Sequence, residues 1–409
     1  MAYDMLKQCN FEYSPSIPDW GVVTHGPTLQ LLSFVTSPRE SLVIACCAFA
    51  ALGTISPESV AEDLPGVMMA GGYPRARSSV ALPASASPTQ FAARDSTPTE
   101  MQATALVKQL SANKANLAVL MLERGKIIYE AHNFPSGEAI PLMSFSMSKT
   151  LTAYTVGNML CEGVIQSLDS PAQNYSSLLK GTVYGEATVK NLLMMTSGAK
   201  DADAAVVKPD PWRDITLGTY TLNNYVQKFK YRDSRFFGGP VLSGSRFVYS
   251  NTDTTSLGFL AEDNGGFINN FDRLIWRKIG AEGKGYWQVD KDGLPITYAG
   301  FSATARDWGR LALFSLDQLK NGTKCQRNFM TEAISPLISN TSSSGRSFSH
   351  YGYQTWIGNF GPRPSYWYVG YGGQRIGIDP EKERILIIFS VNEEYMGDVY
   401  RAFGSWQRQ

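Results

Sequence analysis

The residues Ser146-Met-Ser-Lys149 place a hydroxyl and an amine three positions apart, after the apolar stretch Ile140–Met143 and before a long apolar helical segment. Two residues at this spacing lie on the same face of a helix, so Lys149 can share a proton with Ser146. A lysine accepts that proton only where burial or a nearby charge lowers its pKa. Other Ser-x-x-Lys sets occur, among them those at 111–114 and 177–180, and a plain helix cap is the alternative interpretation of Ser146.

Two further short motifs carry groups that acyl transfer uses. Tyr249-Ser-Asn251 offers a phenol, which can act as a general base beside an ammonium group, and an amide that can hold the lysine and a substrate. In Tyr371-Gly-Gly-Gln374, two glycines let backbone N–H groups approach a ligand closely and stabilise an oxyanion. Each motif alone also fits a structural role, an ordinary loop for the first and a β-bulge for the second.

The order and spacing of the three motifs resemble the serine hydrolases of the β-lactamase and penicillin-binding fold. The resemblance extends over roughly residues 100–400 and includes Leu192–Gly198, in which Met195 stands where histidine is frequent. Within that fold the sequence is most similar to the class C β-lactamase-like branch, with its esterases and 6-aminohexanoate-dimer hydrolases. Pro209–Arg213 and Gly373–Pro380 resemble the dimer hydrolases in particular.

The resemblance implies a role for each polar side chain of the first two motifs. Ser146 matches the acylated nucleophile, and Lys149 matches its general-base partner. Tyr249 matches the proton shuttle for the leaving group and the deacylating water. Asn251 matches the residue that orients Lys149 and the substrate.

The resemblance also implies an oxyanion hole and one wall of the acyl pocket. The backbone N–H groups of Ser146 and Gln374 would form the oxyanion hole, beside Gly372 and Gly373. Trp212 is expected to line the acyl pocket, with an exposed or core tryptophan as the alternative.

The third motif departs from the penicillin-recognising members, which carry Lys-Thr-Gly where this chain has Tyr371-Gly-Gly. Without that lysine, an anionic β-lactam or peptidoglycan carboxylate loses a charge-assisted contact worth roughly 1.5–3 kcal/mol. Esters and neutral or amino-bearing amides therefore match the site better, although Arg375 could supply a charge from the next positions.

Short apolar runs at both ends of the folded part predict strands, whereas helical periodicity dominates about 145–320. We expect an α/β (α+β), β-lactamase-like fold in which an antiparallel sheet is formed from both ends of the domain. Helices flank this sheet, and a helical lobe is inserted at about 165–300. Because Thr97-Pro-Thr-Glu100 is a helix start signal, we expect the hydrolase domain to span 97–409. A Ser-, Ala-, Gly- and Pro-rich linker or loosely draped arm would precede it at 62–96.

The first sixty residues carry a different pattern. Residues 1–40 show no sustained period and are expected to be an untranslated or disordered leader. Residues 41–61 combine an apolar run with a small-x-small site, the pattern of a secretory signal. We expect translation to start near Val35 and the protein to be periplasmic or secreted, with Cys46 as a candidate lipid anchor. A buried helix or strand, in a cytoplasmic protein, is the alternative.

The composition narrows the classes of protein further. With 37 Lys+Arg against 36 Asp+Glu, the net charge is +1, which argues against a nucleic-acid binder. Three histidines and no Cys-x-x-Cys pair argue against a metal site, so we expect no metal or other cofactor. No carboxylate partner of His132 or His350 is discernible, which argues against a Ser-His-Asp triad. Whether Cys161 pairs with Cys325 stays open, although export would permit it.

These observations predict a serine hydrolase that cleaves a small-molecule ester or amide through an acyl-enzyme on Ser146. A true β-lactamase or D,D-peptidase is one alternative, which the missing lysine disfavours. A catalytically silent member that binds a ligand or partner is another. The complete set of Ser146, Lys149 and Tyr249 argues against a silent site, because such a site has no physical need to keep a lysine near the serine.

Overall fold

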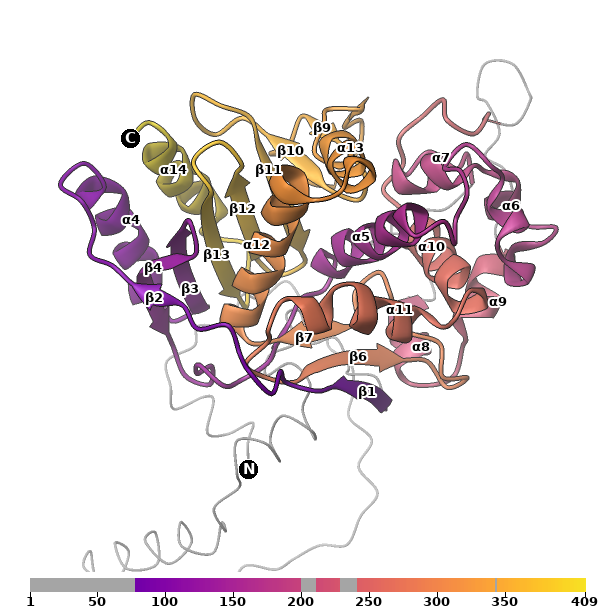
Figure 1. Ribbon diagram of the computed structural model, residues 1–409, viewed down its shortest axis with the longest axis horizontal. Helices are drawn as coiled ribbons and strands as arrows, with labels where there is room; N and C mark the ends of the chain where they lie inside the picture. The colour runs from indigo at the N-terminus through magenta and orange to yellow at the C-terminus, as the bar shows by residue number, and fades with distance from the viewer. Residues whose placement is uncertain (1–77, 200–210, 229–240, 343) are drawn as a thin grey trace, which may run out of the picture. The chain divides into compact units, whose positions relative to one another are not determined.

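The computed structural model describes residues 78–199, 211–228, 241–342 and 344–409. The leader expected at 1–40, the signal segment expected at 41–61 and the anchor Cys46 lie outside these ranges. Within them, the elements form a nine-stranded sheet, a four-stranded sheet and the helices around them (Figure 1). No helix in these ranges combines the length and the apolar character that crossing a membrane requires.

The nine-stranded sheet is built from both ends of the domain. Its strand order is β2-β4-β3-β13-β12-β11-β10-β9-β8, and its pairs are antiparallel except that the short β2 runs parallel to β4. β3 lies beside β13, with Glu123 opposite Arg384 and Leu120 opposite Ile387. The sheet predicted from both termini is therefore confirmed, with one parallel pair at its edge. Its strands are β2 (Ala92–Ala93), β3 (Asn116–Glu123), β4 (Lys126–His132), β8 (Ile338–Ser339), β9 (His350–Tyr351), β10 (Trp356–Gly358), β11 (Ser365–Gly370), β12 (Gln374–Asp379) and β13 (Arg384–Ser390).

Side chains of the central strands alternate between two apolar layers. Val119 and Met121 of β3 belong to the layer that includes α4 (Met101–Ala112) and α14 (Met396–Gln407). Leu120 and Leu122 belong to the layer under α5 (Met147–Cys161), α12 (Ala305–Asn321) and α13 (Lys324–Ala333). Figure 1 shows α4 and α14 together on one side of the sheet and α12 on the other. Because both faces are covered, β3 and β13 are apolar without alternating polar positions.

A second, four-stranded sheet has the order β1-β6-β7-β5. Its strands are β1 (Ser78–Leu82), β5 (Leu142–Met143), β6 (Gly285–Val289) and β7 (Phe301–Ala303). The expectation of a linker or loose arm at 62–96 is wrong for β1, which pairs along its whole length with β6. Leu82 is the single buried residue of β1, so the strand is held by its backbone and its side chains give almost no apolar signal.

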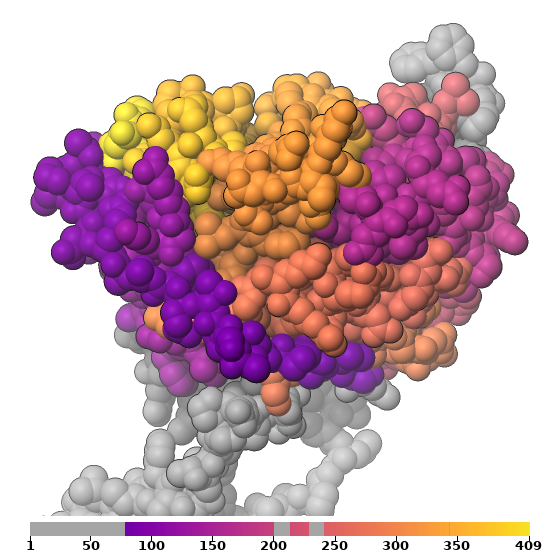
Figure 2. Space-filling model, viewed as in Figure 1, coloured from indigo at the N-terminus to yellow at the C-terminus, as the bar shows by residue number. Residues whose placement is uncertain are grey.

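Residues 83–96 also lie against the domain rather than loosely over it. Trp276 Nε1 donates to the Pro83 carbonyl oxygen at 2.8 Å, and Arg310 Nε donates to the Thr89 carbonyl oxygen at 2.9 Å. In Figure 2 this indigo segment runs across the surface of the later residues in orange. Helix α4 starts at Met101 and not at the predicted Pro98. The Glu100 carboxylate accepts from the Thr97 N–H and thus closes a turn ahead of the helix.

The helical region follows α5 in the chain. Its helices are η2 (Ala172–Asn174), η3 (Ser177–Leu179), α6 (Val183–Glu186), α7 (Val189–Leu193), α8 (Pro211–Thr216), α9 (Leu222–Lys228), α10 (Asn251–Asp263), α11 (Phe267–Leu274) and η4 (Trp276–Lys278). The lobe expected at 165–300 also contains β6 of the second sheet. α5 lies between this region and the main sheet, and every residue from Met147 to Met159 is buried. A helix enclosed on all sides needs no polar face. Its buried threonines and Asn158 donate to backbone carbonyl oxygens instead of to water.

Candidate active site

Ser146 and Lys149 meet at the N-terminal end of α5. Ser146 is the residue that precedes the helix, and Lys149 is 1% exposed. The Lys149 Nζ donates to Ser146 Oγ at 3.0 Å, to Asn251 Oδ1 at 2.7 Å and to the Tyr298 carbonyl oxygen at 3.0 Å. These three acceptors match the three N–H groups of a lysine ammonium. The amine is thus fixed beside the serine hydroxyl by groups from three separate parts of the chain.

The backbone that leads into Ser146 is held in an unusual conformation. Phe145 has a φ of 47°, in the left-handed region that a bulky residue rarely adopts. The Ser144 N–H donates to the Phe301 carbonyl oxygen at 3.0 Å, and the Phe301 N–H donates to Ser148 Oγ at 3.0 Å. Two contacts with β7 therefore fix the chain on both sides of the serine. Strained residues of this kind persist where the surrounding structure determines them and are frequent at functional sites.

The second motif lies at the start of α10. Asn251 is the first residue of that helix, and Ser250 Oγ caps it by accepting from the Asp253 N–H at 3.0 Å. The Lys149 Nζ is 5.1 Å from the centre of the Tyr249 ring and 5.3 Å from that of the Tyr298 ring. The faces of two aromatic rings thus approach the amine, an arrangement that attracts a cation.

Further aromatic residues fix the Tyr249 ring from behind. Its centre is 5.2 Å from that of Trp356 and 6.2 Å from that of Tyr351. Burial, together with the nearby Tyr249 and Asp253, raises the pKa of Tyr351 well above its ordinary value. Tyr351 is therefore a neutral neighbour of Tyr249 throughout the range in which hydrolases work.

The third motif forms the turn between β11 and β12. Gly372 and Gly373 have φ values of 72° and 94°, which only glycine adopts readily. A Cβ on Gly370, at the end of β11, would overlap the Ser144 carbonyl oxygen, so this turn starts against the chain that leads to the serine. Tyr371 is 49% exposed, and its ring centre is 5.8 Å from that of Phe145. The turn therefore adds an aromatic side chain beside the residue that precedes the nucleophile.

Two residues after this turn are held by the sheet. The Gln374 side chain bonds both backbone groups of Ser390, accepting from its N–H at 3.0 Å and donating to its carbonyl oxygen at 2.8 Å. The oxyanion role of the Gln374 backbone N–H stays a prediction. Arg375 is 5% exposed and does not present its charge to a substrate. Its guanidinium pairs with the Glu393 carboxylate at 3.3 Å and donates to the carbonyl oxygens of Gly370 and Gln374 and to the Tyr400 hydroxyl.

Other sequence predictions meet different outcomes. Trp212 belongs to α8, but its side chain lies outside the described residues. His132 has a carboxylate partner that its sequence neighbourhood did not reveal, since its Nε2 is 2.9 Å from Glu130 Oε1. Glu130 also pairs with Arg306. The Tyr298 carbonyl oxygen was missed as a partner of the lysine, because a backbone acceptor leaves no signal in the sequence.

A serine hydroxyl, a buried lysine, an asparagine amide and a tyrosine ring thus meet between two parts of one α/β fold. The beta-lactamase family profile matches residues 103–403. The chain belongs to the beta-lactamase family, a family of serine hydrolases.

Comparison with individual proteins shows which members of the family are similar to this chain. The chain is 24% identical over 286 residues to a 6-aminohexanoate-dimer hydrolase of Paenarthrobacter ureafaciens, covering 67% of this chain and 72% of the relative. Among solved structures, a putative 6-aminohexanoate-dimer hydrolase from Bacillus anthracis is similar with a TM-score of 0.60 and 20% identity, covering 79% of this chain and 87% of that chain. EstCE1, a hydrolase with promiscuous acyltransferase activity, gives a TM-score of 0.57 at 14% identity, covering 76% and 98%.

Proposed function

We propose that this protein is a serine hydrolase that cleaves an ester or amide bond through an acyl-enzyme on Ser146. The observation that carries the proposal is the Lys149 Nζ, which is buried and lies 3.0 Å from Ser146 Oγ. A general base must be within hydrogen-bond reach of the proton that it removes. Asn251 and the Tyr298 carbonyl oxygen hold the amine in that position.

The mechanism follows from these positions. Lys149 acts after its ammonium form has released one proton to solvent. The neutral amine takes the proton of Ser146 as the serine oxygen attacks the substrate carbonyl carbon and forms a tetrahedral oxyanion. Backbone N–H groups of Ser146 and Gln374 are proposed to stabilise that oxyanion. Tyr249 passes a proton to the leaving alcohol or amine as its bond to carbon breaks, which leaves the acyl-enzyme. Water then attacks the acyl carbon, its proton moves to the Tyr249 and Lys149 pair, and Ser146 recovers its hydrogen as the acid leaves.

We propose that the substrate is a neutral or amine-bearing ester or amide. Tyr371 stands where penicillin-recognising members have a lysine, and the Arg375 guanidinium is bonded within the fold. The names of two similar proteins, a 6-aminohexanoate-dimer hydrolase and a hydrolase with promiscuous acyltransferase activity, support the same class. A β-lactamase or D,D-peptidase activity is the alternative, and the missing lysine at position 371 disfavours it.

The test is hydrolysis of a short-chain p-nitrophenyl ester and covalent labelling by a fluorophosphonate. Ser146→Ala should abolish labelling and lower turnover by several powers of ten, and Tyr249→Phe should lower turnover by a similar factor while labelling slows. Ser177→Ala is the matched control, because Ser177 and Lys180 have the same spacing without the active-site context. A Ser146→Ala variant that hydrolyses esters as fast as the wild type would refute the assignment.

We also propose that the protein is exported, to the periplasm or beyond. The Cys161–Cys325 disulfide, with a Cα–Cα distance of 5.5 Å, supports this location. Structural disulfides persist in oxidising compartments and are rare in the cytosol. N-terminal sequencing of the protein from its native cells tests the proposal, and a mature chain that starts at Met1 or Ala2 would contradict it.

A further inference from the structure

Met195 contacts the backbone on both sides of Tyr249. Its carbonyl oxygen accepts from the Val248 N–H at 2.9 Å, and its Sδ accepts from the Ser250 N–H at 3.3 Å. Met195 is fully buried and has a φ of 57°, in the left-handed region. In this conformation, Met195 accepts a hydrogen bond from the residue before Tyr249 with its carbonyl oxygen and one from the residue after it with its sulfur.

The residues after Met195 continue along the same segment. The Ser197 hydroxyl donates to Asp253 Oδ1 at 2.7 Å, and the Ser197 N–H donates to Asp253 Oδ2 at 3.3 Å. Residues 195–197 therefore lie beside residues 248–253, from the segment that precedes Tyr249 to the first turn of α10. Of the two hydrogen bonds that Met195 accepts, only the sulfur bond depends on the identity of its side chain.

The sulfur bond matters because Ser250 is buried, with 2% exposure. A buried backbone N–H that loses an acceptor is costly, and a thioether is a weak acceptor that serves only when it is placed well. Leucine in place of Met195 would keep the apolar volume and remove this acceptor. The segment that carries Tyr249 would then lose one of the two hydrogen bonds that Met195 accepts from it.

We propose that Met195 is a positioning residue that fixes the Tyr249 ring over the Lys149 amine through the Ser250 N–H. The inference rests on the proposed function, since it assigns Met195 to the proton transfer in which Tyr249 takes part. It acts through Tyr249 and touches no substrate. Glutamine at this position supplies an acceptor at about the same distance from the backbone. Comparing leucine with glutamine therefore separates the loss of the hydrogen bond from a change in packing.

The experiment compares Met195→Leu with Met195→Gln, and uses Met330→Leu as the matched control because Met330 is another fully buried methionine. We expect Met195→Leu to lower kcat for the p-nitrophenyl ester at least tenfold, with KM within twofold and a shifted pH profile. Met195→Gln should recover kcat to within threefold of the wild type. The idea is overturned if Met195→Leu keeps the wild-type kcat and pH profile, or if glutamine recovers nothing while both variants keep the wild-type Tm.

A second readout does not need turnover. In protein labelled with carbon-13 at the tyrosine Cζ, the Tyr249 signal is assigned as the one missing from Tyr249→Phe. We expect Met195→Leu to move that signal and its titration with pH, and Met330→Leu and Met195→Gln to leave both in place. If the wild type neither hydrolyses esters nor takes the fluorophosphonate, the proposed function fails. In that case the Tyr249 signal still tests whether Met195 positions the Tyr249 ring. A signal that does not move in Met195→Leu overturns that proposal.

Discussion

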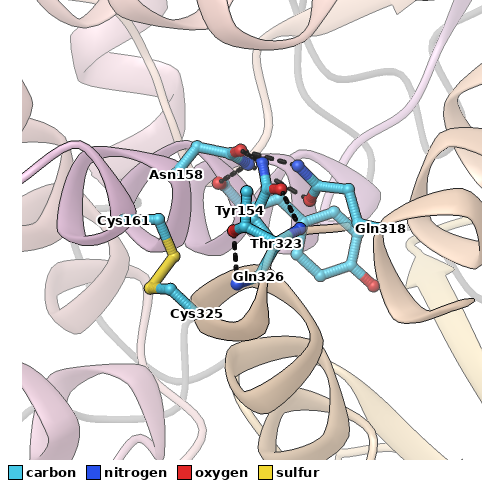
Figure 3. The surroundings of a disulfide bond; sticks show 7 residues. All are labelled: Tyr154, Asn158, Cys161, Gln318, Thr323, Cys325 and Gln326. Carbon is cyan, nitrogen blue, oxygen red and sulfur yellow. Dashed lines mark hydrogen bonds between the residues drawn. A yellow bond between two sulfur atoms is a disulfide. The ribbon is translucent and has the colours of Figure 1, made fainter. Parts of the chain in front are cut away.

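Removal of the Cys161–Cys325 disulfide is expected to lower the free energy of unfolding by about 5 kcal/mol. The bond joins the last residue of α5 to the second residue of α13 and closes a loop across a sequence separation of 164 (Figure 3). A cross-link removes conformational entropy from the unfolded chain, and the effect grows with the logarithm of the loop length. A loop of this length gives the figure of about 5 kcal/mol, near the upper end of what disulfides contribute.

The folded state keeps the two helices together without the bond. Gln326 Nε2 of α13 donates to Asn158 Oδ1 of α5 at 2.9 Å, and the Asn158 amide also donates to Gln318 Oε1 of the neighbouring α12 at 3.2 Å (Figure 3). The lower free energy of unfolding therefore comes from the greater conformational entropy of the unfolded chain and not from a change in the folded state. Below the unfolding transition, ester hydrolysis should stay within twofold, because Ser146 lies at the opposite end of α5.

The assay is urea unfolding, followed by fluorescence, of the wild type and of the Cys161→Ala/Cys325→Ala double variant, each with and without a thiol reductant. The reductant should lower the wild type to the stability of the double variant and leave the double variant unchanged. A free energy of unfolding that stays within about 1 kcal/mol of the wild type in the double variant would refute the reasoning. A large loss of kcat in the folded double variant would show instead that the bond shapes the active site.

Three further predictions concern stability and substrate choice. Glu100→Gln should lower the free energy of unfolding by on the order of 3 kcal/mol at pH 7, because the hydrogen bond from Arg94 lowers the pKa of Glu100 to about 2. That difference should shrink as pH falls from about 5 to about 2, where the folded protein also takes up the proton. Gly157→Ala should destabilise the protein by about 1–3 kcal/mol, because its Cβ would overlap the Phe329 ring. Tyr371→Lys should raise kcat/KM for an anionic β-lactam, relative to a neutral ester, by roughly 10-fold or more, since it adds a charge-assisted contact.

Each of these predictions has its own control and contrary result. The Glu100→Gln difference is followed in urea from pH 7 to pH 2, and a gap that stays constant with pH would contradict the ion-pair argument. For Gly157→Ala the control is Gly397→Ala, where an added Cβ meets nothing within 4 Å; equal effects of the two would remove the packing explanation. For Tyr371→Lys, a β-lactam to ester ratio equal to that of the wild type would show that position 371 does not face the substrate carboxylate.

The longer strands of the main sheet (β3, β4, β11, β12 and β13) and the approach of Lys149 to Ser146 could be predicted because local patterns encode them. The short strands β2, β8, β9 and β10 were not predicted. β3 and β13 are continuous apolar runs, and the Ser-x-x-Lys spacing places both groups on one face whenever a helix follows. Two of the three acceptors of the lysine lie about a hundred residues or more away, at Asn251 and Tyr298. The amide was found through its motif, whereas a backbone carbonyl has no residue identity and gave no signal.

The remaining misses share one physical origin. Ser78–Leu82 pairs through backbone groups while four of its five side chains stay partly or fully exposed, so composition reads as a linker. Glu100 closes a turn and binds Arg94, which delays the start of α4 although the capping pattern at Thr97 is present. His132 and Glu130 face one another because residues two apart share a face of β4. In each case the sequence did not show which partner the residues take, whether that partner is distant, as for β1, or close along the chain, as for Glu100 and His132.

The pairing of β3 with β13 also sets the order in which the molecule is completed during synthesis. Glu123 and Arg384 form a side-chain hydrogen bond across a sequence separation of 261 residues. A nascent chain that has emerged as far as α12 already contains Ser146, Lys149 and Tyr249, but its strand β3 is still an open edge. The last strands must leave the ribosome before that edge is filled. Hydrolytic activity should therefore appear only at the end of translation. A chaperone that holds the chain until then would keep the open edge of β3 from pairing with a strand of another copy.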